Sequence, residues 1–528
     1  MSNFLLKYKT LIFLLIILVI ASFFRLWQLD KIPPGLYPDV AINGNEALDS
    51  LKTGDFKVFY PENNGREGLI IWLIALSFSI FGVSIWSIKI VAAIIGILTV
   101  IGLYLLTKEL FNKNIALLSS FFLAISFWHL NFSRIGFRAI LLPFILVFSF
   151  YFLFNGFRKK NISSFILAGI FFGLGFYTYI SFRIAVLILP FVLIPFWLIY
   201  RKEKQTKKFL LSTFYFLFSI FIIALPIGLY FLQNPQDFIG RAAPISVFAA
   251  ENPIKEFGKS LILHLGMFNF YGDQNWRHNF PGSPMFFWPL GILFLVGIIL
   301  SFKEIFKKSN YQNKNYQLLS TFYFLLSTFF IMLLPGILTY EGIPHALRII
   351  GVIPVVYIFA GLGGWKVFEF LAQNPQRKIL LVSCCLFLVA ISFFEFNKYF
   401  FAWAKNPNVE GAFTKKFADI GYYLNSLPPE IQKYVIVNEG GVPVPWPNGI
   451  PMPAQTIMFI ESSKYGSPQS KYILQENLDQ IKINKETIII PMKYDENLFN
   501  ELIQKFPQGE IKKINEISFY ETPLEIPK

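Results

Sequence analysis

The chain has 528 residues, 55% of them hydrophobic and 15% charged, and a formal net charge of +15. Apolar runs long enough to cross a bilayer recur from Leu11 to Phe394, which excludes a soluble globular protein. Most basic residues lie in short segments between these runs, so the charge indicates membrane topology and not nucleic-acid binding.

The first predicted element is a retained membrane helix over residues 11–29, because Lys7 and Lys9 precede it and no small-residue cleavage site follows. The other predicted spans are residues 88–106, 115–131, 139–157, 163–180, 184–200, 209–232, 285–302, 317–338, 347–370 and 379–398. Basic loops such as Arg158–Lys160 and Arg201–Lys208 belong on the cytoplasmic side. The prediction is a polytopic α-helical protein of the inner, or plasma, membrane, with about eleven and up to thirteen spans, a cytoplasmic N-terminus and an extracytoplasmic C-terminus.

The predicted first outer loop, residues 30–87, carries the leading catalytic candidate. Its apolar stretch Leu69–Phe81 has 13 residues, against the roughly 20 that a transmembrane helix needs, so it is predicted to be juxtamembrane or re-entrant. Prolines and glycines stiffen and bend the chain around Asp39, which favours a functional carboxylate over a merely solvated one. Glu67, directly before the apolar stretch, is the second candidate. Possible substrate-binding residues of the same loop are Glu46 and Arg66.

Three predicted short outer loops contain arginine but no lysine. Their candidate residues are Arg134, Arg138, Tyr179, Arg183, Glu341, His345 and Arg348. Each arginine alone could extend its stem along lipid to water. As a set, however, these arginines break the positive-inside rule, and they differ from the basic residues of the cytoplasmic loops, which are mostly lysine. Because a planar guanidinium suits bidentate phosphate binding, the pattern predicts an anionic, membrane-borne ligand, most simply a lipid phosphate. No Asp or Glu lies between Glu109 and Glu203, which weakens a metal-dependent mechanism, and no metal ligand or cofactor is predicted.

The predicted long outer loop, residues 233–284, combines aromatic rings with polar donors. Asp273, Arg277 and His278, in the run YGDQNWRHNF, are possible substrate-binding residues. Such aromatics suit sugar rings, and they equally suit an interfacial belt at the membrane surface.

The tail, residues 399–528, has an ordinary mixed composition. The runs KYVIVNE and ETIIIPM are typical of buried strands, and they predict a small extracytoplasmic α/β domain. The chain is therefore predicted to divide into a transmembrane module, residues 1–398, and this C-terminal domain.

Four features in this order resemble the GT-C membrane glycosyltransferases: an acidic residue in the first outer loop, GRE before an apolar stretch, SRIGFR and IPHALRIIG. The likeness covers residues 20–370 and is strongest to the protein mannosyltransferase and aminoarabinose-transferase-like group. It implies a GT-C fold, a polyprenyl-phosphate sugar as donor, and transfer to an acceptor on the outer face.

The resemblance also implies that Asp39 is the catalytic acidic residue. Many relatives have Asp-Glu where this chain has Asp39–Val40, so Glu46 or Glu67 would have to replace that Glu if it matters. The acidic pair with which related oligosaccharyltransferases bind metal in their second loop is absent here.

The resulting hypothesis is an inverting, metal-independent glycosyltransferase in which Asp39, with Glu67 second, takes the acceptor's proton. The predicted donor phosphate-binding residues are Arg134, Arg138, Arg183, His345 and Arg348. Its expected partners are a polyprenyl-phosphate-linked sugar, membrane lipid and an envelope acceptor (protein, lipid or glycan), and no nucleic acid. Two alternatives stay open. A lipid-linked saccharide transporter or flippase would need charges inside the spans, where few occur. A non-enzymatic envelope assembly protein would work through its tail.

Overall fold

The computed structural model describes residues 2–239, 243–307, 316–373, 377–444 and 449–523, and the chain forms two compact units. The helical unit comprises Met1–Trp27 and Ala92–Lys405. The loop–tail unit comprises Gln28–Val91 and Asn406–Lys528. Each unit is described by itself below.

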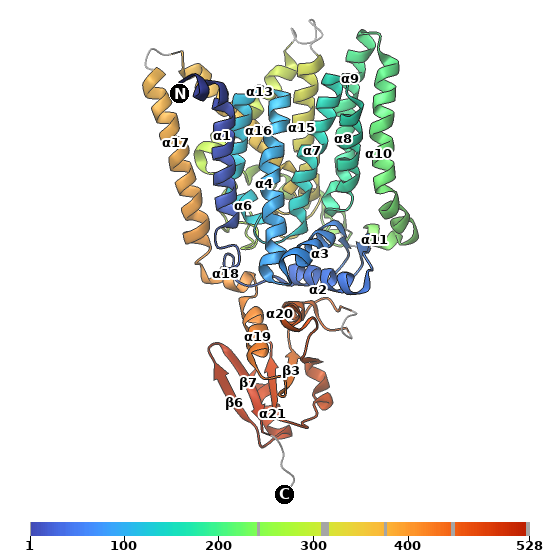
Figure 1. Ribbon diagram of the computed structural model, residues 1–528, viewed down its shortest axis with the longest axis vertical. Helices are drawn as coiled ribbons and strands as arrows, with labels where there is room; N and C mark the ends of the chain where they lie inside the picture. Colours follow the sequence, from blue (N-terminus) through green and yellow to red (C-terminus); the bar gives the residue numbers. More distant parts are fainter. Residues whose placement is uncertain (1, 240–242, 308–315, 374–376, 445–448, 524–528) are drawn as a thin grey trace. The chain divides into compact units, whose positions relative to one another are not determined.

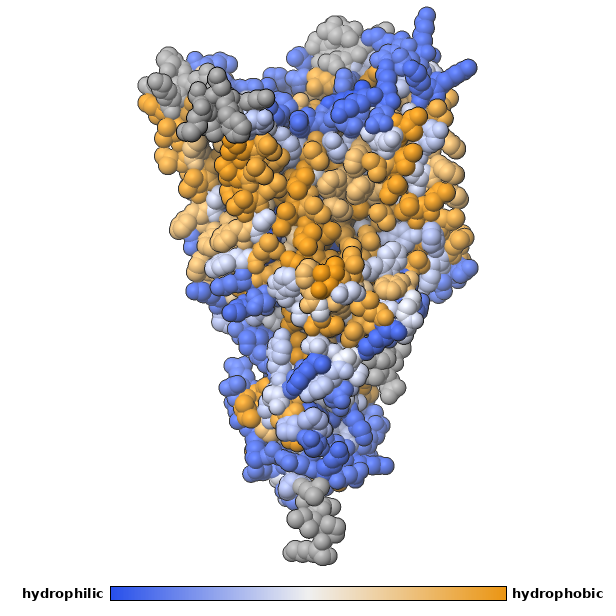
Figure 2. Space-filling model, viewed as in Figure 1, coloured by the Kyte–Doolittle hydropathy of each residue, from blue (hydrophilic) through white to orange (hydrophobic). Residues whose placement is uncertain are grey.

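The helical unit is built mainly from long apolar helices, with a few short ones between them (Figure 1). They are α1 (Ser2–Leu26), α4 (Ile85–Leu110, which begins in the other unit), α5 (Lys113–Ile125), α6 (Phe127–Phe132), α7 (Leu141–Lys159), α8 (Ile162–Gly175), α9 (Leu189–Lys202), α10 (Thr206–Gln233), α11 (Pro235–Ile239), α12 (Pro253–Gly266), α13 (Trp288–Phe306), α15 (Tyr316–Ile337), α16 (Ile353–Leu371) and α17 (Arg377–Asn397). Short 3₁₀ turns include η1 (Arg138–Ile140), η2 (Ile180–Ile188) and η4 (Ile350–Val352). Figure 2 shows apolar side chains gathered over these helices, as a lipid-facing surface requires.

Within the described ranges, nine helices are long and apolar enough to cross a membrane. They are Tyr8–Leu26, Ile85–Leu110, Arg138–Lys159, Ile180–Lys202, Thr206–Gln233, Trp288–Phe306, Tyr316–Ile337, Ile350–Leu371 and Leu381–Trp403. The polytopic helical class is thereby confirmed. Two of the eleven predicted spans, 115–131 and 163–180, correspond to shorter helices, because α5 ends at Ile125 and α8 ends at Gly175. Hydropathy continues across both breaks, so it does not reveal them.

Helices α13 and α16 approach each other closely through small residues. An ideal Cβ built on Gly297 would lie 2.0 Å from the Phe359 carbonyl oxygen, and one on Gly363 would lie 2.0 Å from the Leu293 carbonyl oxygen. Both positions therefore require glycine. Close backbone approach through glycine is the usual way in which membrane helices gain packing contacts.

The loop–tail unit contains the whole predicted first outer loop. Helix α2 (Pro38–Thr53) is followed by the antiparallel pair β1 (Phe59–Tyr60) and β2 (Arg66–Glu67), and then by α3 (Leu69–Phe81). Helix α3 has 13 residues, in agreement with the prediction that this stretch is too short to span. It packs against α2.

The tail forms the predicted α/β fold. Its five-stranded sheet has the order β4 (Lys471–Leu474), β3 (Gln432–Val437), β5 (Thr487–Pro491), β7 (Ile517–Thr522), β6 (Glu510–Ile514). Strands β4, β3 and β5 are parallel, and β7 and β6 are antiparallel additions. Apolar residues of α19 (Lys415–Ser426) and α20 (Gln455–Tyr465) cover one face of the sheet, and those of α21 (Glu496–Lys505) cover the other. Burial on both faces explains the apolar runs of residues 434–437 in β3 and 488–491 in β5.

Helix α2 is attached to the tail by specific contacts. The Asn45 Nδ2 donates to the backbone oxygen of Gln455 at 3.2 Å and to its Oε1 at 2.8 Å. The hydroxyls of Thr414 and Thr456 both donate to the Leu36 carbonyl oxygen at 2.9 Å. The division into domains 1–398 and 399–528 stays a prediction. In the structure, residues 28–91 belong to the same compact unit as the tail, and the helical unit ends at Lys405 instead of residue 398.

Candidate functional site

Asp39 lies in the first turn of α2, directly after Pro38. Proline fits this position because its missing N–H would have no partner there, and the positive end of the helix dipole favours the ionised carboxylate. Its side chain is half-buried. The Asn63 Nδ2 donates to Asp39 Oδ1 at 2.9 Å and fixes the carboxylate.

The turn that carries Asn63 has a backbone suited to asparagine and glycine. Asn63, Asn64 and Gly65 have φ values of 50°, 60° and 83°, in the left-handed region that these residue types tolerate best. The sequence analysis did not single out Asn63. The signal that could have found it is the run NNG, which is typical of such a turn.

A buried cluster lies on the same helix, one to two turns beyond Asp39. Arg66 is fully buried, and its Nη2 donates to Glu46 Oε1 at 2.6 Å while its Nη1 donates to Asn43 Oδ1 at 2.8 Å. Burial raises the pKa of Glu46 to about 7, against the opposing effect of Arg66. These contacts attach β2 to α2, so Arg66 and Glu46 hold the framework of the turn that carries Asn63.

Glu67 has a different environment from Asp39. It is 2% exposed and lies in β2, paired in register with Phe59. A buried carboxylate is less accessible to an acceptor than a half-buried one, so the surroundings favour Asp39 of the two predicted carboxylates.

The arginine-bearing loops of the helical unit meet through direct contacts. The Arg138 guanidinium lies 5.5 Å from the ring centroid of Tyr179. Two residues on, the Ser181 hydroxyl donates to the Arg348 carbonyl oxygen at 3.0 Å. The Nη1 of Arg348 donates to Thr339 Oγ1 at 2.8 Å and to the Glu341 carbonyl oxygen at 2.6 Å. The structure therefore brings together the three loops that carry Arg138, Tyr179 and Arg348, with the contact to Arg348 made at its backbone.

Arg134 and Arg183 are held by other groups. Arg134 is 0% exposed, and its Nη1 and Nη2 donate to the carbonyl oxygens of Phe24 and Trp27, each at 2.8 Å. It thereby satisfies carbonyls at the C-terminal end of α1, where a cation is favoured. Arg183 donates to the Phe238 carbonyl oxygen and lies over the Phe231 and Phe238 rings. These contacts favour structural roles for both.

Three further predicted residues, Asp273, His278 and His345, lie together in the segments that follow α12 and α15. Asp273 accepts a hydrogen bond from His278 Nδ1 at 3.0 Å and another from the Ala346 amide at 2.7 Å. The rings of His278 and His345 have centroids 4.8 Å apart. Arg277 is half-buried and donates from Nε to Asn275 Oδ1 at 3.2 Å, and Glu341 is exposed.

His264 of α12 fixes the loop that carries His345. Its Nε2 accepts from the His345 amide at 3.1 Å, so its Nδ1 carries the proton and donates to the Ser260 carbonyl oxygen at 2.8 Å. Burial lowers the pKa of His264 to about 4, in keeping with a neutral ring. This is a structural histidine.

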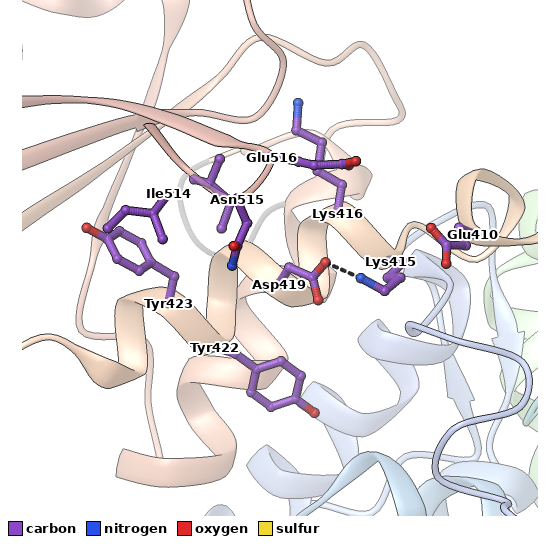
Figure 3. A pocket seen from close by; sticks show the side chains of 10 residues that line it. Glu410, Lys415, Lys416, Asp419, Tyr422, Tyr423, Ile514, Asn515 and Glu516 are labelled. Atoms are coloured by element: carbon purple, nitrogen blue, oxygen red, sulfur yellow. Dashed lines mark hydrogen bonds and ion pairs between the residues drawn. The ribbon is translucent and has the colours of Figure 1, made fainter. Parts of the chain in front are cut away.

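A cavity of about 550 Å³ lies in the tail between α19 and the β6–β7 turn. Figure 3 shows its lining side chains, among them Tyr422, Tyr423 and the ion pair of Lys415 with Asp419, which are 2.6 Å apart. Its lining carries three acidic residues, Glu410, Asp419 and Glu516, against the two basic residues Lys415 and Lys416, so it does not select for an anion. None of the residues predicted as functional lines it.

Residues 69–230 match the family model of dolichyl-phosphate-mannose–protein mannosyltransferases. A stretch of 201 residues is 28% identical to an uncharacterized protein of Aquifex aeolicus (strain VF5), and it spans 35% of this chain and 39% of that relative.

Solved structures of membrane glycosyltransferases share the fold over nearly the whole chain. The structure of ArnT from Cupriavidus metallidurans bound to undecaprenyl phosphate has a TM-score of 0.54 at 13% identity, and the match covers 97% of each chain. The Archaeoglobus fulgidus oligosaccharyltransferase tethered with an acceptor peptide has a TM-score of 0.54 at 15% identity; the match covers 92% of this chain and 65% of that one. AglB from Archaeoglobus fulgidus, in complex with an inhibitory peptide and a dolichol-phosphate, has a TM-score of 0.50 at 13% identity, over 99% of this chain and 75% of that one. At these identities the likeness is one of fold, and it agrees with the motif resemblance. The chain is therefore a multi-pass membrane protein with the fold of the GT-C superfamily of glycosyltransferases.

Proposed function

We propose that this protein is an integral-membrane glycosyltransferase that moves a sugar from a polyprenyl-phosphate donor to an envelope acceptor on the extracytoplasmic face. The observation that carries the proposal is the half-buried Asp39 carboxylate, held by Asn63 at the start of α2. The ArnT structure with undecaprenyl phosphate and the AglB structure with dolichol-phosphate support the donor class, since both proteins share this fold.

The proposed reaction is a single displacement. An acceptor hydroxyl or amine attacks the anomeric carbon of the donor sugar, and the bond from that carbon to the phosphate oxygen breaks. The electron pair of that bond leaves with the lipid phosphate, and the acceptor's proton passes to the Asp39 carboxylate. One displacement inverts the anomeric configuration.

The developing negative charge on the leaving phosphate needs cations. We assign this role to Arg138 and Arg348, which lie in loops joined through Tyr179 and Ser181. Arginine alone can supply the charge, so the proposed bond-forming step uses no metal ion. Arg134 is assigned to the framework because it is fully buried and both of its Nη atoms donate to carbonyl oxygens. Arg183 is assigned to it because its guanidinium lies over two aromatic rings and donates to the Phe238 carbonyl oxygen.

The topology is part of the same proposal. The basic loops Arg158–Lys160 and Arg201–Lys208 place their ends of the helices in the cytoplasm by the positive-inside rule. The N-terminus is then cytoplasmic, and the tail is extracytoplasmic.

The test is Asp39→Asn, assayed in membranes supplied with a labelled polyprenyl-phosphate sugar. Loss of the base lowers transfer by about 10²–10⁴-fold. Asp49→Asn is the matched control, because Asp49 lies on the same helix and is exposed; it should transfer at the wild-type rate. Transfer by Asp39→Asn at the wild-type rate would remove Asp39 from the mechanism.

A further inference from the structure

The side chains of Asp273, His278 and His345 converge outside the spans of the helical unit. Each offers one ligand atom, and these atoms all lie within 4.8 Å of one another. Asp273 and His278 are 1% and 3% exposed. The 3.0 Å between Asp273 Oδ2 and His278 Nδ1 is close to the separation of about 3.3 Å between two ligands of a tetrahedral ion bound at roughly 2.0–2.1 Å.

A simple Asp–His hydrogen bond would account for two of these residues and leave the third unexplained. The Nδ1 of His345 is buried, and it has no hydrogen-bond partner among the residues that the structure describes. A buried polar atom without a partner is unfavourable, and a bound metal ion would give this nitrogen a partner.

We propose that Asp273, His278 and His345 bind one divalent transition-metal ion of the zinc class. One carboxylate and two imidazoles are a ligand set that zinc accepts, with a fourth position left for water or an anion. The ion joins the segment between α12 and α13 to the segment between α15 and α16.

The surroundings of these ligands are ordered as a metal site requires. Asp273 Oδ1 accepts from the Asn275 amide at 2.7 Å, and Oδ2 accepts from the Ala346 amide at 2.7 Å. The His278 ring stacks on Phe132 with centroids 5.8 Å apart. Protein groups thus hold the Asp273 carboxylate and the His278 imidazole in place, whereas His345 Nδ1 has no partner among the described residues.

This inference goes beyond the proposed transfer reaction, in which no step passes through the ion. The ion would instead hold the segment that carries His345, and it would thereby position Arg348, which follows three residues later. The sequence predicted no metal ligand, because the second outer loop contains no Asp or Glu. The site instead takes two imidazoles and one carboxylate from two later loops.

The test is metal binding by the purified full-length protein after treatment with a chelator. Titration with Zn²⁺ should show one tight site per chain, and Co²⁺ in its place should give visible absorption bands of a four-coordinate nitrogen–oxygen site. His345→Ala should raise the Kd for Zn²⁺ by about 100-fold or more, since it removes a direct ligand. Zn²⁺ should raise the unfolding temperature of the wild type and not of this variant.

Glu251→Gln is the control, because Glu251 is an exposed carboxylate of the same unit; it should bind Zn²⁺ as the wild type does. If His345→Ala does not fold, His345→Gln replaces it and should show the same loss. A wild type without a tight site, or a His345 variant with unchanged Zn²⁺ affinity, would overturn the proposal. The measurement reads metal alone, so its failure leaves the transfer proposal to its own test.

Discussion

Among the residues that the structure describes, the Asn63 side chain is the one that donates a hydrogen bond to the Asp39 carboxylate. It donates to Oδ1, from a turn whose backbone has positive φ. Hydrogen bonds to a charged acceptor contribute about 1.5–3 kcal/mol. A carboxylate that is held at one oxygen can accept a proton at the other.

Replacing Asn63 by glycine keeps the turn, since glycine tolerates its φ of 50°, and removes only the amide. We expect Asn63→Gly to lower the rate of transfer about tenfold or more, because the Asp39 carboxylate loses its fixed orientation. Asn64→Gly is the matched control: this neighbour also has positive φ, is exposed, and should retain activity. Equal rates for the two variants in the membrane assay would contradict a positioning role for Asn63.

Two arginines that look alike in sequence differ in what they contact. Arg134 is fully buried and donates to the carbonyl oxygens of Phe24 and Trp27. Arg348 also donates to a carbonyl oxygen, but it is only half-buried, in the loops that we assign to the donor phosphate. Arg348→Ala should therefore raise the KM for the donor about 10–100-fold in folded protein. Arg134→Ala should destabilise the protein by about 3 kcal/mol or more, because it leaves buried carbonyls without donors.

Measuring the KM for the donor and the thermal unfolding of both variants separates the two roles. If Arg134→Ala folds normally and loses donor affinity instead, Arg134 belongs to the phosphate site after all.

Helix α2 joins the catalytic candidate to the tail at the scale of elements. Gly44 lies where α2 meets α20, and an ideal Cβ there would fall 2.7 Å from Ile88 Cδ1 and 2.7 Å from Phe459 Cε2. Both neighbours are side chains in a packed core, so they can yield only at the cost of displaced rotamers.

We expect Gly44→Ala to destabilise the protein by about 1–3 kcal/mol and to lower its unfolding temperature. Gly258→Ala is the contrasting change, since Gly258 lies inside α12 with nothing within 4 Å of its ideal Cβ. There alanine should be neutral or stabilise the helix by up to about 1 kcal/mol. Thermal unfolding in detergent compares the two, and a Gly44→Ala protein as stable as Gly258→Ala would show that α2 does not pack as described.

The whole loop–tail unit should respond as one body. Ile457 is fully buried in the core that α19 and α20 form over the sheet. Ile457→Ala should cost about 2–5 kcal/mol and loosen this core. Since α2 packs on α20, hydrogen exchange should accelerate in residues 38–53 as well as in the tail, and not in α7 or α16. Unchanged protection of α2 in the variant would show that the first loop and the tail are independent.

The alternation of apolar runs with basic loops by itself determined the helical membrane class, because a hydrocarbon core accepts few other sequences. The strands β3 and β5 were equally predictable, since they are buried on both faces. The breaks after Ile125 and Gly175 were not, because hydropathy is uniform across them and helix ends are set by local packing.

At the site, residue type and order were enough to single out Asp39, Arg138 and Arg348 as candidates. Only the tertiary structure decided that Arg134 serves α1 and that Glu67 is buried. It also revealed Asn63 as the partner of Asp39, and brought His345 to Asp273 and His278. The sequence determines which chemical groups the chain carries. The role of each group depends on the contacts that it makes with residues far away in the sequence, and only the tertiary structure decides those contacts.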